Sequence, residues 1–170
     1  PPFRPPHSLR RPEGEGRGLY SFLGIADSER VIVLILDTTE AANKQRTAFT
    51  ELKKAAKSTI ASLPPNIRLN VLAYGEQPLT EMAPAPLYAT DSVKRKAWAF
   101  VDDLNAGGGS GAGPALLKAL GYEDSSAVFI EASGPLKLNS GDYTEIRRLS
   151  RRHHTKVHAV LYKGEAGEDA

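Results

Sequence analysis

Two uninterrupted apolar runs are the strongest structural signals in the chain. Residues 30–37, RVIVLILD, hold six consecutive apolar positions and end at an aspartate, and residues 126–133 read SAVFIEAS. Runs of this kind, rich in β-branched side chains, are typical of strands that are buried on both faces. They therefore predict central strands of a largely parallel sheet that helices cover on both sides.

Apolar positions at spacings of three and four predict helices elsewhere. One such helix contains Trp98, which is expected to anchor it to the core, and its start has Thr90 as a capping candidate. Another has Pro114 in its first turn and Gly121 just past its end. The predicted helical segments are 49–63, 89–106, 113–121 and 142–154.

Three further segments read as strands. Residues 67–75 alternate apolar and polar positions and end in glycine, and residues 156–163, KVHAVLYK, are predicted to form a further strand. Residues 78–84 are bounded by prolines, which predicts an edge strand that pairs with 67–75 as a hairpin. The resulting order, β-α-β-β-α-α-β-α-β, indicates a doubly wound α/β fold. Its sheet is mostly parallel, with one antiparallel edge strand and helices on both faces.

The ends of the chain differ from its middle. Residues 1–20 carry five prolines and four arginines without any period, which predicts a largely disordered arm or linker. The alternative is an arm that packs along the domain edge through Phe3, Leu9 and Tyr20. Residues 21–163 are expected to form a single domain, and residues 164–170 a polar tail.

Composition narrows the function classes. The formal net charge is +2, which gives no support for a nucleic-acid partner, and the basic stretch 147–154 is expected to be a solvated helix face. The absence of cysteine excludes disulfides and thiolate sites. No run approaches the roughly 20 apolar residues of a membrane span, so no direct membrane insertion is predicted. The location is unknown: we expect a soluble domain, which could belong to a larger membrane-associated or exported bacterial protein.

Candidate chemistry lies in loops that follow predicted strands. In doubly wound sheets, ligands bind at the carboxyl ends of the strands. Asp37 and Thr39 follow the first strand, and Glu131 and Ser133 end the strand 126–132. Hard divalent cations prefer such carboxylate and hydroxyl oxygens, so these residues suggest a Mg²⁺ or Ca²⁺ site.

The glycine-rich segment 106–113, AGGGSGAG, does not fit other glycine motifs. A phosphate-binding Walker loop needs a lysine after the glycines, and a dinucleotide fingerprint should follow the first strand. The hydrolase elbow Gly-x-Ser-x-Gly nearly matches around Ser110, but Ala112 takes the last position and a helix precedes it. The chain shows no serine with a plausible histidine and aspartate order, so no catalytic residues are predicted.

The segments together resemble the von Willebrand factor A domain family over about residues 20–162. The resemblance is carried by LYSFLGIADSERVIVLILD, by FTELKKAAKSTIASLPPNIRLNVLAYGEQP, by AWAFVDDLNAGGGSGAGPALLKAL and by AVFIEASGP. It implies a Rossmann-like fold with a metal-ion-dependent adhesion site. In the family's Asp-x-Ser-x-Ser motif, Asp37 matches, Thr39 keeps the first hydroxyl and Ala41 replaces the second. Ser110 corresponds to the threonine of the glycine loop, and Ala132 falls at the aspartate of Thr-Asp-Gly.

The resemblance therefore implies a degenerate site, with Asp37, Thr39, Ser110 and Glu131 as remaining ligands and at most weak Mg²⁺ or Ca²⁺ binding. No other cofactor is expected. Glu131 would have to reach the site from the opposite face of its strand. The expected function is a non-enzymatic adhesion or scaffold module, whose partner is another protein or another region of a larger parent protein. Candidate contact residues in its loops are Glu40, Tyr74, Gln77, Gly109, Ser133 and Leu136.

Two alternatives stay open. The first is a working Mg²⁺- or Ca²⁺-dependent adhesion site, in which Glu131 or Glu40 replaces the missing ligands. The second is an α/β hydrolase or a nucleotide-handling domain, which would use the glycine-rich segment around Ser110 for chemistry.

Overall fold

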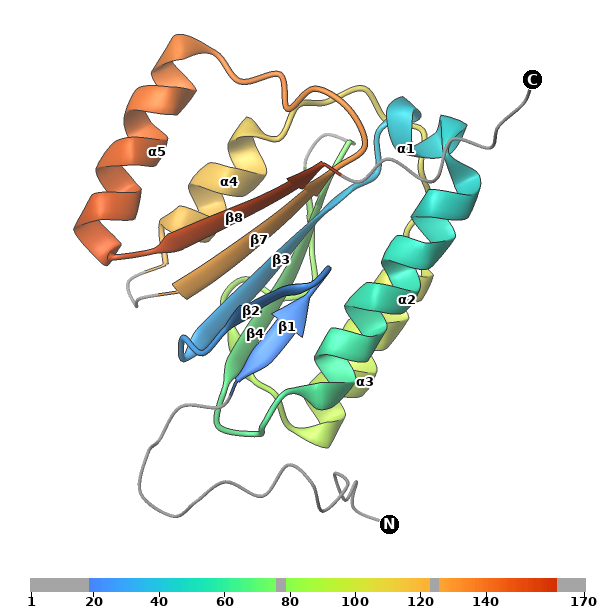
Figure 1. Cartoon of the computed structure of the whole chain (residues 1–170), viewed down its shortest axis with the longest axis vertical. Coiled ribbons are helices and arrows are strands. Elements are labelled where there is room, and N and C mark those ends of the chain that lie inside the picture. The colour runs from blue at the N-terminus through green and yellow to red at the C-terminus, as the bar shows by residue number, and fades with distance from the viewer. Residues whose placement is uncertain (1–18, 76–78, 123–125, 162–170) are drawn as a thin grey trace.

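The structure of the chain is a computed structural model, which describes residues 19–75, 79–122 and 126–161. Figure 1 shows a central sheet with helices on both of its faces. The candidate residue Gln77, most of the predicted arm and the predicted tail 164–170 lie outside the described residues.

Within the described residues, the central sheet has six strands and is mostly parallel. Four parallel strands lie in the order β4-β3-β7-β8, and β5 and β6 pair antiparallel with β4. The predicted doubly wound α/β fold is thus confirmed, and the antiparallel edge consists of two short segments instead of one. The strands are β3 (Val31–Asp37), β4 (Arg68–Tyr74), β5 (Thr80–Glu81), β6 (Leu87–Tyr88), β7 (Ser126–Ala132) and β8 (Lys156–Leu161).

Helices pack on both faces of the sheet and form two separate cores with it (Figure 1). Every residue of β3 and β7 is buried, as the apolar runs predict for strands between two helical layers. One core includes Leu34, Leu52 and Phe129, and the other includes Ile35, Leu116 and Ile130. The helices are α2 (Arg46–Ser62) and α3 (Asp91–Asp102) on the first face, and α4 (Gly113–Leu120) and α5 (Ser140–His153) on the second.

Helix termini follow local capping chemistry. The Thr90 hydroxyl accepts the Val93 N–H at 3.3 Å, which confirms its capping role at α3. The α5 helix begins two residues earlier than predicted, because Asn139 and Asp142 form a capping box around its first turn. A short helix, α1 (Glu40–Lys44), precedes α2, so helical structure starts well before the predicted residue 49.

Trp98 does not anchor α3 in the core. Trp98 is 41% exposed, whereas the core contacts of α3 come from the buried Ala97 and Val101 and the partly buried Val93 and Phe100. The apolar stripe of this helix therefore leaves its largest aromatic residue at the surface.

A β-hairpin precedes the sheet and was not predicted. Its strands are β1 (Tyr20–Phe22) and β2 (Ile25–Asp27), and the turn places Leu23 and Gly24 at positive φ. Tyr20, which the composition assigns to the arm, is 3% exposed and opens β1. Tyr20 and Phe22 meet the ring of Phe129 edge-on at 6.4 and 5.9 Å between centroids. The hairpin therefore belongs to the packed domain.

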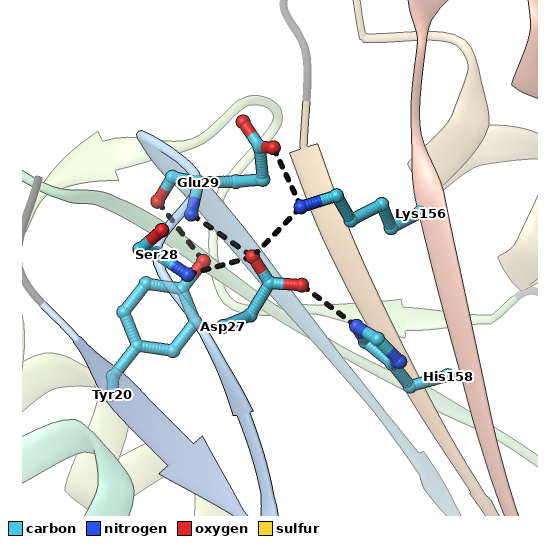
Figure 2. Close-up of polar contacts among 6 residues, drawn as sticks. All are labelled: Tyr20, Asp27, Ser28, Glu29, Lys156 and His158. Atoms are coloured by element: carbon cyan, nitrogen blue, oxygen red, sulfur yellow. Dashed lines mark hydrogen bonds and ion pairs between the residues drawn. The ribbon is translucent and has the colours of Figure 1, made fainter.

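A polar cluster joins this hairpin to β8 (Figure 2). The buried Asp27 carboxylate contacts His158 Nε2 at 2.8 Å and Lys156 Nζ at 3.5 Å, and Lys156 also lies 3.0 Å from Glu29. Burial alone would raise the pKa of Asp27, but His158, the backbone N–H groups of Ser28 and Glu29, and Lys156 together lower it. The cluster therefore stabilises the hairpin in its position against the sheet edge.

Asp27→Asn is expected to lower the free energy of unfolding by about 2 kcal/mol at neutral pH, because charge-assisted hydrogen bonds are lost. Because the pKa of Asp27 is lower in the folded protein than in the unfolded chain, its ionised carboxylate stabilises the fold fully above the unfolded pKa of about 3.9. This stabilisation is lost as the pH falls through the folded pKa. The difference in the free energy of unfolding between wild type and variant should therefore disappear in strong acid. Urea unfolding at a series of pH values measures this difference. Asp103→Asn, at an exposed position, is the control, and a gap that persists at about pH 2 would contradict the assignment.

Candidate functional site at the carboxyl edge of the sheet

The carboxyl ends of β3, β4 and β7 bring three loops together. Asp37 is paired with Tyr74 in the register of β3 and β4, and β7, which pairs with the other side of β3, ends beside them at Ala132. The Thr38 N–H donates to the carbonyl of Tyr74 at 2.8 Å. As predicted from the topology, the candidate residues of the first and third loops therefore share one edge of the sheet.

The glycine-rich segment lies across this edge and is hydrogen-bonded to each of its loops. The N–H groups of Gly107 and Gly108 donate to the Thr38 carbonyl at 3.0 and 3.1 Å. The Ser110 N–H donates to the Gly75 carbonyl at 2.9 Å, and the Ala112 N–H donates to the Leu136 carbonyl at the same distance. The segment is thus a backbone bridge across the edge and not a free linker.

The Asp37 carboxylate lies at the centre of the edge and is 1% exposed. Its Oδ1 accepts the Thr39 N–H at 2.8 Å, and its Oδ2 accepts the Ser133 N–H at 2.7 Å. Charge-assisted hydrogen bonds to backbone amides are among the stronger polar contacts in proteins. Both oxygens of the best candidate ligand therefore already have a protein donor.

Glu131 is buried beneath this carboxylate and contacts Asp37 through the backbone. Its Oε2 accepts the Asp37 N–H at 3.2 Å, and its Oε1 accepts the Ser133 hydroxyl at 3.1 Å. Because Glu131 follows Phe129 by two residues, it shares that residue's face of β7, as the alternation of strand side chains requires. The side chain thus reaches the main chain of Asp37 from the opposite face of the sheet.

Burial raises the pKa of Glu131 to about 8. The Asp37 N–H and the Ser133 hydroxyl oppose this rise, and the negative charge of Asp37 adds to it. Burial therefore disfavours the ionised form of the Glu131 carboxyl group. Tyr74, which donates its hydroxyl to the Glu131 carbonyl at 3.3 Å, also has a raised pKa, through burial and these two acidic groups.

The remaining candidates differ in their access to solvent. Tyr74 is only 1% exposed, so it is not available for partner contacts as the sequence suggests, and Ser133 is also buried. Leu136 is partly buried against the core. Thr39 and Ser110 are half-buried, whereas Glu40 and Gly109 are exposed. The accessible surface of the edge therefore comes mainly from the start of α1 and from the glycine-rich segment.

This edge offers few oxygen ligands for a Mg²⁺ or Ca²⁺ ion. Such ions need several oxygen ligands, whereas Ala41 and Ala132 supply none and both oxygens of Asp37 accept amides. A Cβ placed on Gly134 would lie 3.0 Å from the Ala41 Cβ, so the loop after β7 packs against the start of α1. Within residues 19–75, 79–122 and 126–161, no group of three or more His, Asp or Glu side chains is arranged to hold a metal.

Among the residues that the structure describes, no histidine is hydrogen-bonded to Ser110, the serine of the elbow-like motif. Its N–H is used in the bridge to Gly75, and the described histidines lie on α5, at its end and on β8. His158 is held by Asp27 in the hairpin cluster (Figure 2), where Ser28 contributes a backbone N–H and Tyr20 donates to the Glu29 carbonyl. No nucleophilic side chain in the described part of the chain is hydrogen-bonded to this Asp–His pair.

Comparisons with known proteins rest on structure. No protein-family model and no curated protein matches the chain. A von Willebrand factor type A structure from Catenulispora acidiphila superposes on 79% of this chain with a TM-score of 0.67 and 20% identity. This chain spans 34% of that one. The VWA domain of SpRpn10 covers 81% of this chain, and 77% of its own length, with a TM-score of 0.53 and 9% identity. The chain therefore has the fold of a von Willebrand factor A domain.

Proposed function

We propose that the chain is a non-enzymatic protein-binding module that engages its partner at the carboxyl edge of the sheet without a resident divalent cation. The partner is another protein or another region of a larger parent protein. One observation supports binding without a cation: the two oxygens of the Asp37 carboxylate accept the N–H groups of Thr39 and Ser133. These charge-assisted hydrogen bonds stabilise the buried negative charge without a cation.

The shape of the edge supports a role in binding. The glycine-rich segment is fixed by hydrogen bonds to the loops after β3, β4 and β7, so its surface is preorganised and little conformational entropy is lost on association. Exposed groups with different chemistry lie there: the Glu40 carboxylate, the Gly109 backbone and the Lys137 ammonium group, which donates to the Gly109 carbonyl at 3.0 Å. Within the described residues, no helix is long and apolar enough to span a membrane.

Millimolar Mg²⁺, Mn²⁺ or Ca²⁺ is expected to leave the thermal unfolding midpoint unchanged relative to EDTA. A cation present at 100 times its dissociation constant from a native-state site would add about 2.7 kcal/mol. For a chain of this length that corresponds to roughly 5–10 °C. Calorimetric titration should likewise show no heat of binding. A clear upward shift that Asp37→Ala abolishes would show that the cation-dependent alternative is correct.

Gly109→Arg is expected to weaken partner binding at least about tenfold while leaving the fold intact. A Cβ at Gly109 meets nothing within 4 Å, so the long side chain projects from the proposed surface. The matched control is Tyr143→Arg, at a 55% exposed position on α5. Affinity capture from the source organism in EDTA, followed by binding measurements with the purified partner, compares the two variants. Equal loss in both, or binding that needs a cation, would contradict the proposal.

A further inference from the structure

A groove with a volume of about 530 Å³ runs along the outer side of α3, away from the carboxyl-edge site. Its lining is mostly apolar, with Ala61 from α2 and Ala99 and Trp98 from α3. Asp91 and Lys94 border it near the start of α3, and Asp102 lies near the other end. The groove is therefore about one helix long, or roughly 16 Å at 1.5 Å per residue.

Trp98 is held in a fixed orientation beside this groove. Its Nε1–H donates to the Lys57 carbonyl at 3.1 Å, and the Lys57 ammonium group lies 5.3 Å from the ring centroid. Lys57 is in turn fixed by Asp102, with 2.6 Å between Nζ and Oδ1. A large aromatic ring that is 41% exposed and already immobilised offers contact area at a low cost in entropy. These are the properties of a binding surface and not of a core residue.

We propose that this groove is the docking site of the chain's own proline- and arginine-rich segment, residues 1–18. Polyproline II segments bind grooves lined by aromatic side chains and need no backbone pairing with an exposed strand. The segment begins PPFRPP and contains five prolines and four arginines. At about 3.1 Å per residue, six residues in this conformation extend over roughly 18 Å, which matches the length of the groove. An arginine guanidinium can also stack on the indole ring.

The point where the segment joins the domain is close to the groove. Leu19 is 75% exposed and precedes β1, which packs against α2 through a hydrogen bond of 2.6 Å from the Thr59 hydroxyl to the Ser21 carbonyl. Thr59 lies two residues before Ala61, which lines the groove. Figure 1 shows that β1 starts at the end of the molecule where α2 ends and α3 begins. Eighteen extended residues span roughly 55 Å, so the whole groove is within reach.

The charges on the groove rim are mixed, with Asp91 and Asp102 opposed by Lys94 and Arg95. Docking should therefore depend mainly on apolar contact and only weakly on salt. Tethering supplies an effective concentration of the order of millimolar, so even a weak contact is populated within one chain. This inference does not rest on the proposed function, because the groove and the carboxyl edge share no residues.

The test uses Trp98, the single tryptophan of the chain, as its own reporter. A full-length variant carries a Gly/Ser sequence of equal length in place of residues 1–18, and circular dichroism checks that it is folded. Acrylamide quenching of Trp98 is expected to be about twofold weaker in the wild type than in this variant, because the docked segment covers the 41% exposed ring. A synthetic peptide of residues 1–18, added to millimolar concentration, should restore the protection.

Two point variants control for local effects on the indole. Ala99→Lys on the exposed groove floor should increase quenching in the wild-type background and leave it unchanged in the Gly/Ser background, which is the coupling expected of a docked segment. Tyr143→Lys on α5 should change neither. Equal quenching in the wild type and the Gly/Ser variant would overturn the proposal. Protection that grows with protein concentration and survives the Gly/Ser replacement would also overturn it, since a second copy would then occupy the groove.

Discussion

Gly75→Ala is expected to lower the free energy of unfolding by about 3 kcal/mol or more. Gly75 has a φ of +140°, a region that residues with a side chain rarely adopt. An added Cβ would also lie 2.7 Å from the backbone carbon, the carbonyl oxygen and the hydroxyl oxygen of Thr38. Thr38 cannot retreat freely, because its N–H and its hydroxyl both donate to the Tyr74 carbonyl at 2.8 Å. Urea unfolding of the variant measures the loss.

Alanine substitutions at two other glycines of the same edge distinguish the cost of backbone strain from the cost of a steric clash. Gly107 also has a positive φ, of +149°, but a Cβ there meets nothing within 4 Å, so Gly107→Ala should cost less than Gly75→Ala. Gly109 has neither constraint, so Gly109→Ala should change stability by no more than about 0.5 kcal/mol. The predicted order of destabilisation is therefore Gly75, Gly107, Gly109. Equal effects at the three positions would show that the backbone at this edge relaxes.

The layout of the sheet could be predicted because burial on two faces leaves a clear sequence pattern. In β3 and β7, no polar side chain interrupts the run before the carboxyl end of the strand, and the structure buries both strands completely. The short segments β5 and β6 pair with β4 over two residues each, which is too short for any period to appear. One of them was predicted from its flanking prolines, and β6 was not predicted.

The hairpin β1–β2 was missed for a similar reason. Each strand has three residues, and its turn has Leu23 rather than asparagine, aspartate or glycine at its first position of positive φ. The usual sequence signal of a two-residue hairpin turn is therefore half absent. Tertiary packing of Tyr20 and Phe22 on Phe129 stabilises the hairpin instead, and contacts this distant in sequence leave no local pattern.

At the carboxyl edge, the sequence could place Asp37, Thr39, Ser133 and Glu131 near one another, but not assign their contacts. The Asp37 carboxylate is held by the backbone N–H groups of Thr39 and Ser133, and every residue except proline carries such a donor. A carboxylate that binds amides and one that binds a cation therefore look alike in sequence. The sequence shows alanine at 41 and 132, where the family resemblance implies ligands, and only the structure shows that the Asp37 carboxylate accepts two amides.

Asp37→Ala is expected to lower the free energy of unfolding by about 3–5 kcal/mol. The change leaves the N–H groups of Thr39 and Ser133 without their acceptor in a site where Asp37 is 1% exposed. It also loosens the loops after β3 and β7, because the hydrogen bond from the Ser133 N–H connects them across 96 residues of sequence. Urea unfolding in EDTA measures the loss, and Glu40→Ala, an exposed carboxylate on the same edge, should cost less than about 0.5 kcal/mol.

The same variant distinguishes a structural carboxylate from a cation ligand. If Asp37 acts through the two amides, the destabilisation is the same in EDTA and in millimolar Mg²⁺, because no cation contributes to the wild-type stability. A cation ligand would instead give a variant close to wild type in EDTA and a gap that widens with cation concentration. Asp37→Asn sharpens the comparison, since its single amide oxygen can replace only one of the two acceptors and its NH₂ group opposes the other N–H. If Asp37 acts through its two hydrogen bonds, Asp37→Asn should destabilise the fold almost as much as Asp37→Ala, although it preserves the side-chain volume. A cost well below that of alanine would instead show that packing, and not the two hydrogen bonds, accounts for the contribution of Asp37.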